Sequence, residues 1–476
     1  MEQTLWEIIP FDVLFEITTH LDLADILSFL LVCPSFRKLS ASRYLWIDVL
    51  ERTQKHRRLA CPVGLDITTL EIDQLQRVAH LTHRVRTNWS KQSPRIFGAT
   101  KSVPYVRPSE AEPAAILVAI QGTPLVVLYT QENTERLICC DMASTSPNPR
   151  ASMHVGTISR RAHYDEFGRH IIALVTRGDR ISLRVIAMTY GERSAPEMKE
   201  LFSSYLDVPC RALFICRDVI GVVPFAVDDS ALFSIRAFNY NTGISFNIFV
   251  DLGYQIYNTS YVFCSVFDDT PYVITVEDKD YCIHKVPWEL LPHGSKTCSI
   301  EDGGSVEGNL TLVAEISRAG VEDSFYVETA ELRWSPRGLH GIFVQYTSSY
   351  TDTTCTLVRS WPRDLPPSSH NEMTMDGRVS SYSQSRVSPW LVGSSPSGTY
   401  SAAIINCSEV EETSSRVCSG LCLLEYSCDP PGVQCRQLTL PFYIDLDQIY
   451  SIALDERCGV IYISHVLGHL FAIPYA

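Results

Sequence analysis

The sequence has 476 residues, of which 45% are hydrophobic and 20% are charged, so we expect a folded protein of two or more domains. Its formal net charge of −14 excludes a general binder of nucleic acids or of anionic membranes, because both require a basic surface. No stretch is long enough for a membrane span and residues 1–4 do not begin a secretory signal, so we expect a soluble protein of the cytoplasm, the nucleus or both.

Four short helices are predicted within residues 9–57. Pro10 suits the first turn of a helix because its φ angle is fixed and it has no N–H group. Asp22 is a suitable N-cap for the second helix, and Pro34 opens the third. The fourth helix is expected over residues 43–57.

These helices carry more apolar side chains than a bundle of about forty residues can cover by itself. The second helix is apolar around most of its circumference and must be buried on several sides. We expect the bundle to bury Leu14, Ile17, Leu27, Leu31 and Phe36, and we expect another protein to complete its core. An ordinary helical subdomain that packs on the rest of the chain is the alternative.

The order of these residues resembles the F-box, the helical module by which a substrate receptor docks on the Skp-family adaptor of an SCF ubiquitin ligase. The resemblance rests on Ile9-Pro10, Leu21-Asp22, Val32-Cys33, Phe36 and Leu45-Trp46. It departs at Ile9, where many F-boxes have leucine. The resemblance implies a Skp-family adaptor as partner, a cullin-RING ligase reached through that adaptor, and a separate target protein. The residues implied to bind the adaptor are Ile9, Pro10, Leu14, Ile17, Leu21, Leu27, Val32, Cys33, Phe36, Leu39 and Trp46.

A longer helix is predicted after the turn at residues 64–69. Apolar residues recur at helical spacing from Leu70 to Val85, and Asn88-Trp89 closes the segment. This stretch resembles the linker helix of a large group of fungal F-box proteins, where a similar element leads into a β-rich domain. It implies either a rigid spacer or a plain connecting helix. The expected domains are a helical module at 1–58, a linker at 59–95 and a β domain at 96–476.

From about residue 96 the apolar period changes from 3.6 to 2, and short runs rich in Val, Ile, Phe, Tyr and Thr alternate with turn residues. About 380 residues of such pattern favour a degenerate β-propeller of six to eight four-stranded blades, with paired β-sandwiches as the alternative. A faint repeat supports the propeller, since turns ending at Gly168, Gly338, Gly398 and Gly459 each precede a strand, as in the hairpins of WD-like blades. Residues 363–389, rich in Ser and Pro, are expected to form a flexible excursion from a blade.

Catalytic and metal-binding patterns are weak throughout. The stretch at 393–397 lacks the second glycine of a nucleophile elbow, and His465 with His469 lacks the H-E-x-x-H pattern of zinc proteases. The cysteines between 407 and 435 contain no C-x-x-C pair. We therefore predict a non-catalytic receptor with no catalytic residue, metal or cofactor. The alternative is an enzyme or a lectin-like binding protein on a propeller scaffold, with the helices as a cap.

Overall fold

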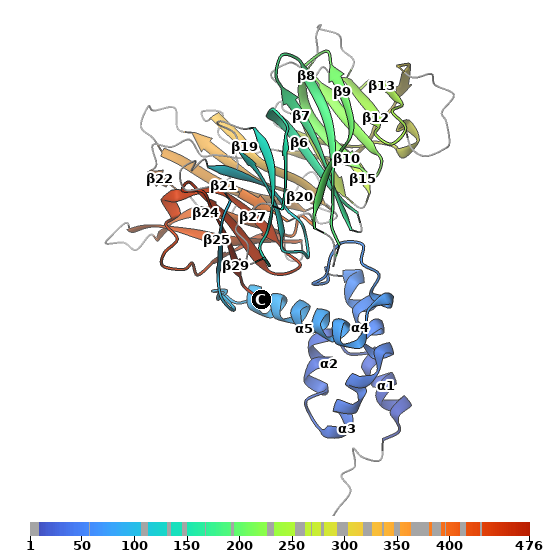
Figure 1. Ribbon diagram of the computed structural model, residues 1–476, viewed down its shortest axis with the longest axis vertical. Coiled ribbons are helices and arrows are strands. Elements are labelled where there is room, and N and C mark those ends of the chain that lie inside the picture. The colour runs from blue at the N-terminus through green and yellow to red at the C-terminus, as the bar shows by residue number, and fades with distance from the viewer. Residues whose placement is uncertain are drawn as a thin grey trace, which may run out of the picture.

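The computed structural model contains a helical module and a large β domain, which one long helix connects (Figure 1). The structure describes residues 9–476 except 57, 106–112, 131–134, 145–149, 167, 192–194, 226–232, 253–261, 268, 278–279, 293–302, 318–325, 336–337, 347–352, 363–379, 383–391, 396, 410–415 and 429–430. The mixed fold class predicted from the sequence, a small all-α bundle before a large all-β domain, is confirmed.

The predicted helices are present. They are α1 (Phe11–Thr19), α2 (Leu23–Phe29), α3 (Pro34–Arg37), a 3₁₀ turn (Lys38–Ala41), α4 (Arg43–His56), a second 3₁₀ turn (Ile67–Thr69) and α5 (Ile72–Trp89). The side chain of Asp22 accepts a hydrogen bond from the Asp25 N–H and caps α2, as predicted. Pro34 occupies the first turn of α3, where its missing N–H costs no hydrogen bond.

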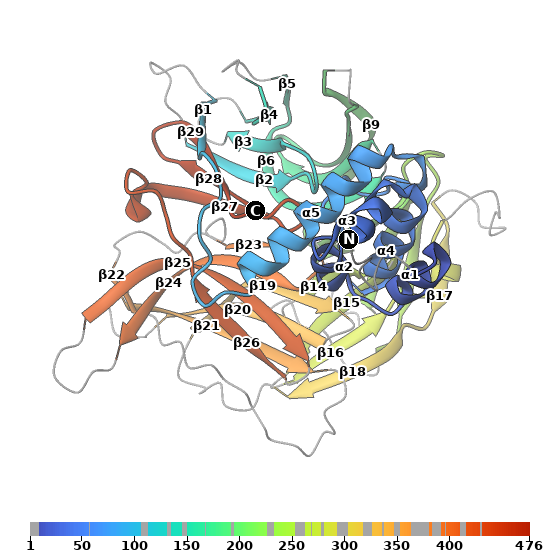
Figure 2. The ribbon, with the colours of Figure 1, turned by 90° about the horizontal axis from the view of Figure 1, so that it is seen from below.

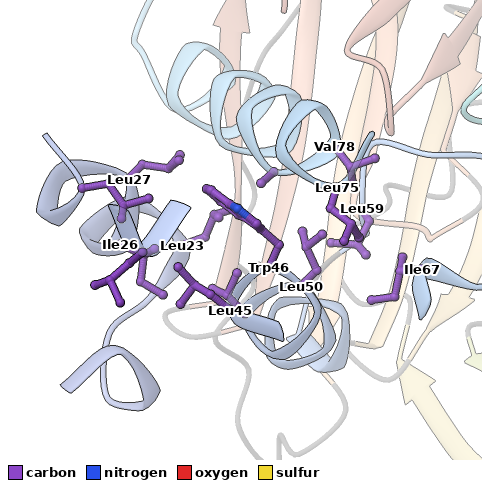
Figure 3. Packing of buried hydrophobic residues seen from close by; sticks show 14 of the residues in the cluster. Leu23, Ile26, Leu27, Leu45, Trp46, Leu50, Leu59, Ile67, Leu75 and Val78 are labelled. Carbon is purple, nitrogen blue, oxygen red and sulfur yellow. The ribbon is translucent and has the colours of Figure 1, made fainter. Parts of the chain in front are cut away.

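The core of the helical module includes side chains from the linker as well as from the first four helices (Figure 3). Trp46 of α4 is 1% exposed, and its indole Nε1 donates to the Ser40 carbonyl. Leu75 and Val78 of α5 belong to the same cluster, as does Leu59. The linker therefore covers some of the apolar side chains that we expected a partner protein to cover.

The β domain contains 29 described strands. They are β1 (Lys101–Pro104), β2 (Ala114–Ala119), β3 (Leu125–Thr130), β4 (Arg136–Asp141), β5 (Ala151–His154), β6 (Thr157–Glu166), β7 (Arg169–Arg177), β8 (Ile181–Thr189), β9 (Glu197–Leu206), β10 (Cys210–Cys216), β11 (Val219–Pro224), β12 (Phe233–Asn239), β13 (Ser245–Val250), β14 (Val262–Phe267), β15 (Thr270–Glu277), β16 (Asp280–Lys285), β17 (Ser305–Gly308), β18 (Thr311–Ser317), β19 (Tyr326–Ser335), β20 (Gly338–Tyr346), β21 (Thr353–Pro362), β22 (Ser380–Tyr382), β23 (Val392–Ser394), β24 (Tyr400–Glu409), β25 (Arg416–Cys428), β26 (Pro431–Gln437), β27 (Ile449–Asp455), β28 (Val460–His465) and β29 (His469–Pro474). Short 3₁₀ turns also lie at Trp288–Leu290 and Leu446–Gln448.

These described strands form seven sheets, six of four strands and one of five, arranged around a ring (Figure 2). The first strands of successive sheets are neighbours, as β6 contacts β10, β10 contacts β14, β14 contacts β19, β19 contacts β23, and β27 contacts both β23 and β2. Buried residues of β3 and β4 pack on those of β7 and β8 and close the remaining junction. The predicted propeller of six to eight blades is confirmed, and the alternative of paired sandwiches is wrong because each sheet packs on two neighbours around a ring.

Two strands pair with strands that are not next to them in chain order. β1 pairs antiparallel with β29, so the first strand of the domain completes the sheet made by the last three. β17 lies between β16 and β18 in sequence but pairs with β13 of the preceding sheet. Each pairing adds to a blade a strand from another part of the chain, which stabilises the closed ring.

The four predicted glycine turns all lie in hairpins between the first two strands of a blade, as expected. Gly168, Gly398 and Gly459 have positive φ angles, which glycine adopts without a Cβ clash. Of the segment 363–389 the structure describes only β22, so the predicted excursion otherwise lies outside the described residues.

The burial of Asp455, the last residue of β27, can be tested through its titration. Its buried carboxylate accepts hydrogen bonds from the backbone N–H groups of Gly122, Arg457 and Cys458. Burial nevertheless raises the pKa of Asp455 to about 6, because a charge is poorly solvated there. A raised folded pKa adds stability below the unfolded pKa, and this stability is lost as the pH rises through the folded value.

We therefore expect the free energy of unfolding of Asp455→Asn to increase relative to that of wild type as the pH rises from 4 to 7. The rise in the pKa of Asp455 corresponds to about 3 kcal/mol in unfolding free energy. Urea denaturation of wild type and Asp455→Asn at several pH values measures this difference. A difference that stays constant with pH would contradict the assignment.

Candidate functional site

The helical module exposes an unusual number of large apolar side chains. Of the thirteen exposed large hydrophobic residues among the described ones, six lie between residues 11 and 44. We call them the module surface, and they are Phe11, Val13, Ile17, Leu31, Val32 and Tyr44. The helices that carry them lie at the end of the molecule away from the propeller (Figure 1). Single exposed hydrophobics are common, but such a concentration on one small module indicates a protein interface.

The local structure explains why these side chains point outward. Leu31 and Val32 follow α2 in a turn, where their N–H groups donate to the carbonyls of Ser28 and Phe29. The ring of Phe29 stacks on Phe36 at a centroid distance of 4.1 Å and fixes the adjoining core. Since the turn is anchored below by these rings, Leu31 remains 73% exposed.

Three aromatic rings continue this surface along α1 and α4. The Phe15 ring lies 6.4 Å from that of Phe11 and 5.0 Å from that of Tyr44, centroid to centroid. Aromatic side chains contribute large contact areas at little cost in conformational entropy. This row is therefore well suited to a stable interface.

The structure divides the predicted adaptor-binding residues into three groups. Leu14, Leu27, Phe36, Leu39 and Trp46 are buried in the module, Ile9, Leu21 and Cys33 are half-buried, and Pro10, Ile17 and Val32 are exposed. The prediction that the module buries Ile17 and Leu31 is wrong, because these side chains are 39% and 73% exposed. Ile17 lies on α1 and Leu31 lies in the turn after α2, whereas the core of the module is completed by side chains of the linker.

Sequence reasoning missed Val13 and Leu31 as candidate interface residues, and it also missed the aromatic residues Phe11 and Tyr44. Phe11 directly follows Pro10 at the start of α1, and Tyr44 lies in the first turn of α4. An available signal was their aromatic character beside otherwise polar neighbours, Asp12 and Arg43.

Buried hydrogen bonds hold α1 and α2 in place. The Arg52 guanidinium donates to the carbonyls of Thr18, Thr19 and Leu21 at 2.7 to 3.0 Å, satisfying groups at the end of α1. The Asp25 N–H and the nearby Arg86 lower the pKa of Asp22, which therefore stays ionised as the cap of α2.

The linker is fixed to the propeller by the turn between β27 and β28. The Arg457 guanidinium donates to the carbonyls of Leu59 and Cys61 at 3.2 and 3.0 Å. The backbone of Gly122 approaches the same segment so closely that a Cβ there would lie 2.3 Å from the Cys61 carbonyl oxygen. Only glycine fits this contact without displacing the linker.

The far end of α5 enters the core of the propeller. Trp89 is 1% exposed, and its ring meets Tyr400 edge-on at 4.9 Å. The Asn88 amide donates to the Tyr475 carbonyl at 2.5 Å and exchanges hydrogen bonds with Arg95. The predicted Asn-Trp element thus anchors the helix. Elsewhere the module and the propeller face each other across a cleft of about 1220 Å³, lined by Arg52, His83, Phe267 and Glu456 among others.

Two histidine arrangements bear on the catalytic alternative. His465 and His469 are paired across β28 and β29, and within the described part of the chain no group of three His, Cys, Asp or Glu side chains is placed to hold a metal ion. His170 is fully buried, with Nδ1 2.5 Å from Asp165 Oδ1, so its ring is closed off from solvent.

Comparisons with known proteins agree with the geometry of the module. Residues 6–48 match the family model described as F-box domain. The WD40 domain of SCAP from fission yeast is a similar solved structure, at 11% identity and TM-score 0.36, covering 76% of this chain and 84% of that one. The Cps50 (Swd1) β-propeller domain from Myceliophteria thermophila matches at 8% identity and TM-score 0.42, covering 79% and 99%. A comparison with curated proteins finds no match. Among the described helices, none is long and apolar enough to cross a bilayer.

The division between core and surface residues of the module predicts two different mutant classes. Phe36→Ala should destabilise the module by about 3–5 kcal/mol, since it removes a buried aromatic ring. Leu31→Ser should change stability by less than about 0.5 kcal/mol, since the side chain is exposed. Thermal unfolding followed by helical circular dichroism measures both. Equal losses would contradict the division.

The junction at Arg457 should fix the orientation of the module. In Arg457→Leu the carbonyls of Leu59 and Cys61 lose their donor, so the linker should detach locally while the propeller remains folded. Small-angle X-ray scattering should then show a larger maximum dimension, and proteases should cleave near residues 59–65 sooner. Arg177→Leu, at an exposed position of β7, is the control. Identical scattering from wild type and Arg457→Leu would contradict this role.

Proposed function

We propose that this chain, which carries an F-box domain at its N-terminus followed by a β-propeller, is the substrate-recognition subunit of an SCF-type E3 ubiquitin ligase. The F-box would bind a Skp-family adaptor, and through it a cullin-RING ligase, while the propeller binds the target protein. The match over residues 6–48 and the six exposed side chains of the module surface support this assignment.

The module surface is the observation that carries the proposal. Burying one large apolar side chain contributes about 1.5–3 kcal/mol, so several together suffice for a stable complex after the cost of association. We propose that Phe11, Ile17, Leu31, Val32 and Tyr44 contact the adaptor, with Pro10 at the edge. The buried positions Leu14, Leu27, Phe36, Leu39 and Trp46 would act by shaping this surface.

The remaining parts have complementary roles in this proposal. The domains would be an F-box at 1–58, a linker at 59–95 and a target-binding propeller at 96–476, in a non-catalytic protein of the cytoplasm, the nucleus or both. A linker fixed at both ends would hold the target at a set position relative to the ligase, which raises its effective concentration there. The alternative, a propeller enzyme or lectin with a helical cap, leaves the exposed module surface without a role.

Adaptor binding tests the proposal directly. Leu31→Asp should weaken binding of a purified Skp-family adaptor at least thirtyfold, because it removes an apolar contact and places a charge in the interface. Leu312→Asp, at an exposed leucine of the propeller, is the matched control and should bind as wild type does. Isothermal titration calorimetry measures the affinities. The assignment is wrong if the wild-type chain does not bind the adaptor or if both variants bind equally well.

A further inference from the structure

A second apolar surface lies on the propeller. Phe442, Tyr443, Val466 and Leu467 are exposed, and we call them the Phe442 patch. Phe442 is 99% exposed, the highest value among the exposed large hydrophobic residues of the described chain. The other three such residues on the β domain or its lead-in are Phe97, Tyr205 and Leu312, and the rings of Phe97 and Tyr205 form cation–π contacts with Arg84 and Arg180.

The patch is held in shape from beneath. Ile444 is buried and its N–H donates to the Pro441 carbonyl, so a tight turn pushes Phe442 and Tyr443 outward. The Asp445 carboxylate accepts from the Asp447 N–H and caps the 3₁₀ turn that follows. Aromatic side chains that are exposed in the free protein are suited to anchor a partner, because they provide a large contact area at little cost in side-chain entropy.

The two halves of the patch belong to one surface. The Val466 N–H donates to the Gln448 carbonyl, which joins the turn between β28 and β29 to the connection before β27. The Tyr443 ring lies 6.2 Å from Phe471, whose ring is 6.0 Å from that of His465. A row of neighbouring rings, Tyr443, Phe471 and His465, therefore connects the two halves of the patch.

The patch lies at the strand ends opposite to the linker. In the register of β27 and β28, Ile449 pairs with His465 at one end and Asp455 pairs with Val460 at the other. The Asp455 end carries Arg457, which holds the linker, whereas the His465 end carries the patch. A partner bound there would not compete with the F-box or its adaptor.

The charge around the patch selects the kind of partner. Asp445 and Asp447 are exposed beside the aromatic pair, and neither forms an ion pair with any described residue. Burial and the neighbouring His469 lower the pKa of His465 and outweigh Asp445, which raises it, so the ring does not offset these carboxylates at neutral pH. Two carboxylates repel a phosphorylated or acidic segment and attract Lys or Arg. They also disfavour a second copy of this chain, whose own acidic groups would meet them across a two-fold axis.

We propose that the Phe442 patch is the target-docking surface, and that it binds a peptide segment with an aliphatic or aromatic side chain next to Lys or Arg. This inference rests on the proposed receptor function and adds the chemical class of the target segment. The apolar residue would pack against Phe442, Tyr443 and Leu467, and the basic residue would pair with Asp445 or Asp447.

The test uses the full chain in complex with a Skp-family adaptor. A library of random twelve-residue peptides displayed on phage is selected on this complex, and enriched peptides are synthesised and titrated by fluorescence anisotropy. We expect them to combine an apolar residue with a nearby Lys or Arg. Phe442→Ala should weaken their binding at least tenfold and Asp447→Asn about threefold, with the latter effect shrinking at high salt. Tyr205→Ala, which removes an exposed aromatic ring elsewhere on the propeller, should leave binding unchanged.

Several results would overturn the docking surface while leaving adaptor binding intact. These are a selection without such peptides, peptides that bind Phe442→Ala as tightly as wild type, and acidic or phosphorylated peptides as the preferred ligands. A wild-type dimer that Phe442→Ala converts to a monomer in analytical ultracentrifugation would instead assign the patch to self-association. Failure of the receptor function would appear separately, as loss of the adaptor complex itself.

Discussion

The structure depends on one helix that belongs to two hydrophobic cores. Leu75 and Val78 in the first half of α5 pack in the helical module, whereas Val85 and Trp89 in its last turns pack in the propeller. A helix of 18 residues is about 27 Å long, so it spans the distance between the cores without a flexible joint. Since each end is buried, neither part can rotate freely without exposing apolar surface to water.

Burial within the module separates residues that build a surface from residues that present it. Phe36 and Trp46 are buried between the helices of the module and the linker. They support the turn at Leu31 and the start of α4. Leu31, Val32 and Tyr44 remain in solvent on that frame. A motif read from sequence contains both kinds of position, because substitutions of either would disturb docking, one through folding and the other through contact.

Much of this organisation was predictable from sequence because it depends on local patterns. Pro10, Asp22 and Pro34 mark helix starts through their own backbone chemistry, and the change of period near residue 96 marks the β domain. The side from which each helix is covered was not predictable. Ile17 and Leu31 look like core residues in sequence but are exposed, whereas Trp46 and Leu50 are buried in a core that also contains side chains of α5. The contact between Gly122 and Cys61 could not be predicted either, because the two residues are 61 positions apart in the sequence.

The two exposed apolar surfaces of the molecule differ in position and in the charges beside them. The module surface lies at the end away from the propeller and is flanked by charges of both signs, Asp12 and Glu16 on α1 and Arg43 on α4, whereas the Phe442 patch lies beside Asp445 and Asp447. Apolar contact alone discriminates poorly between partners, because any apolar surface can provide it. The acidic flank of the Phe442 patch adds repulsion against an acidic partner there, and the helix buried at both ends keeps the two surfaces apart. At the Phe442 patch, charge therefore adds the selectivity that apolar contact alone does not provide.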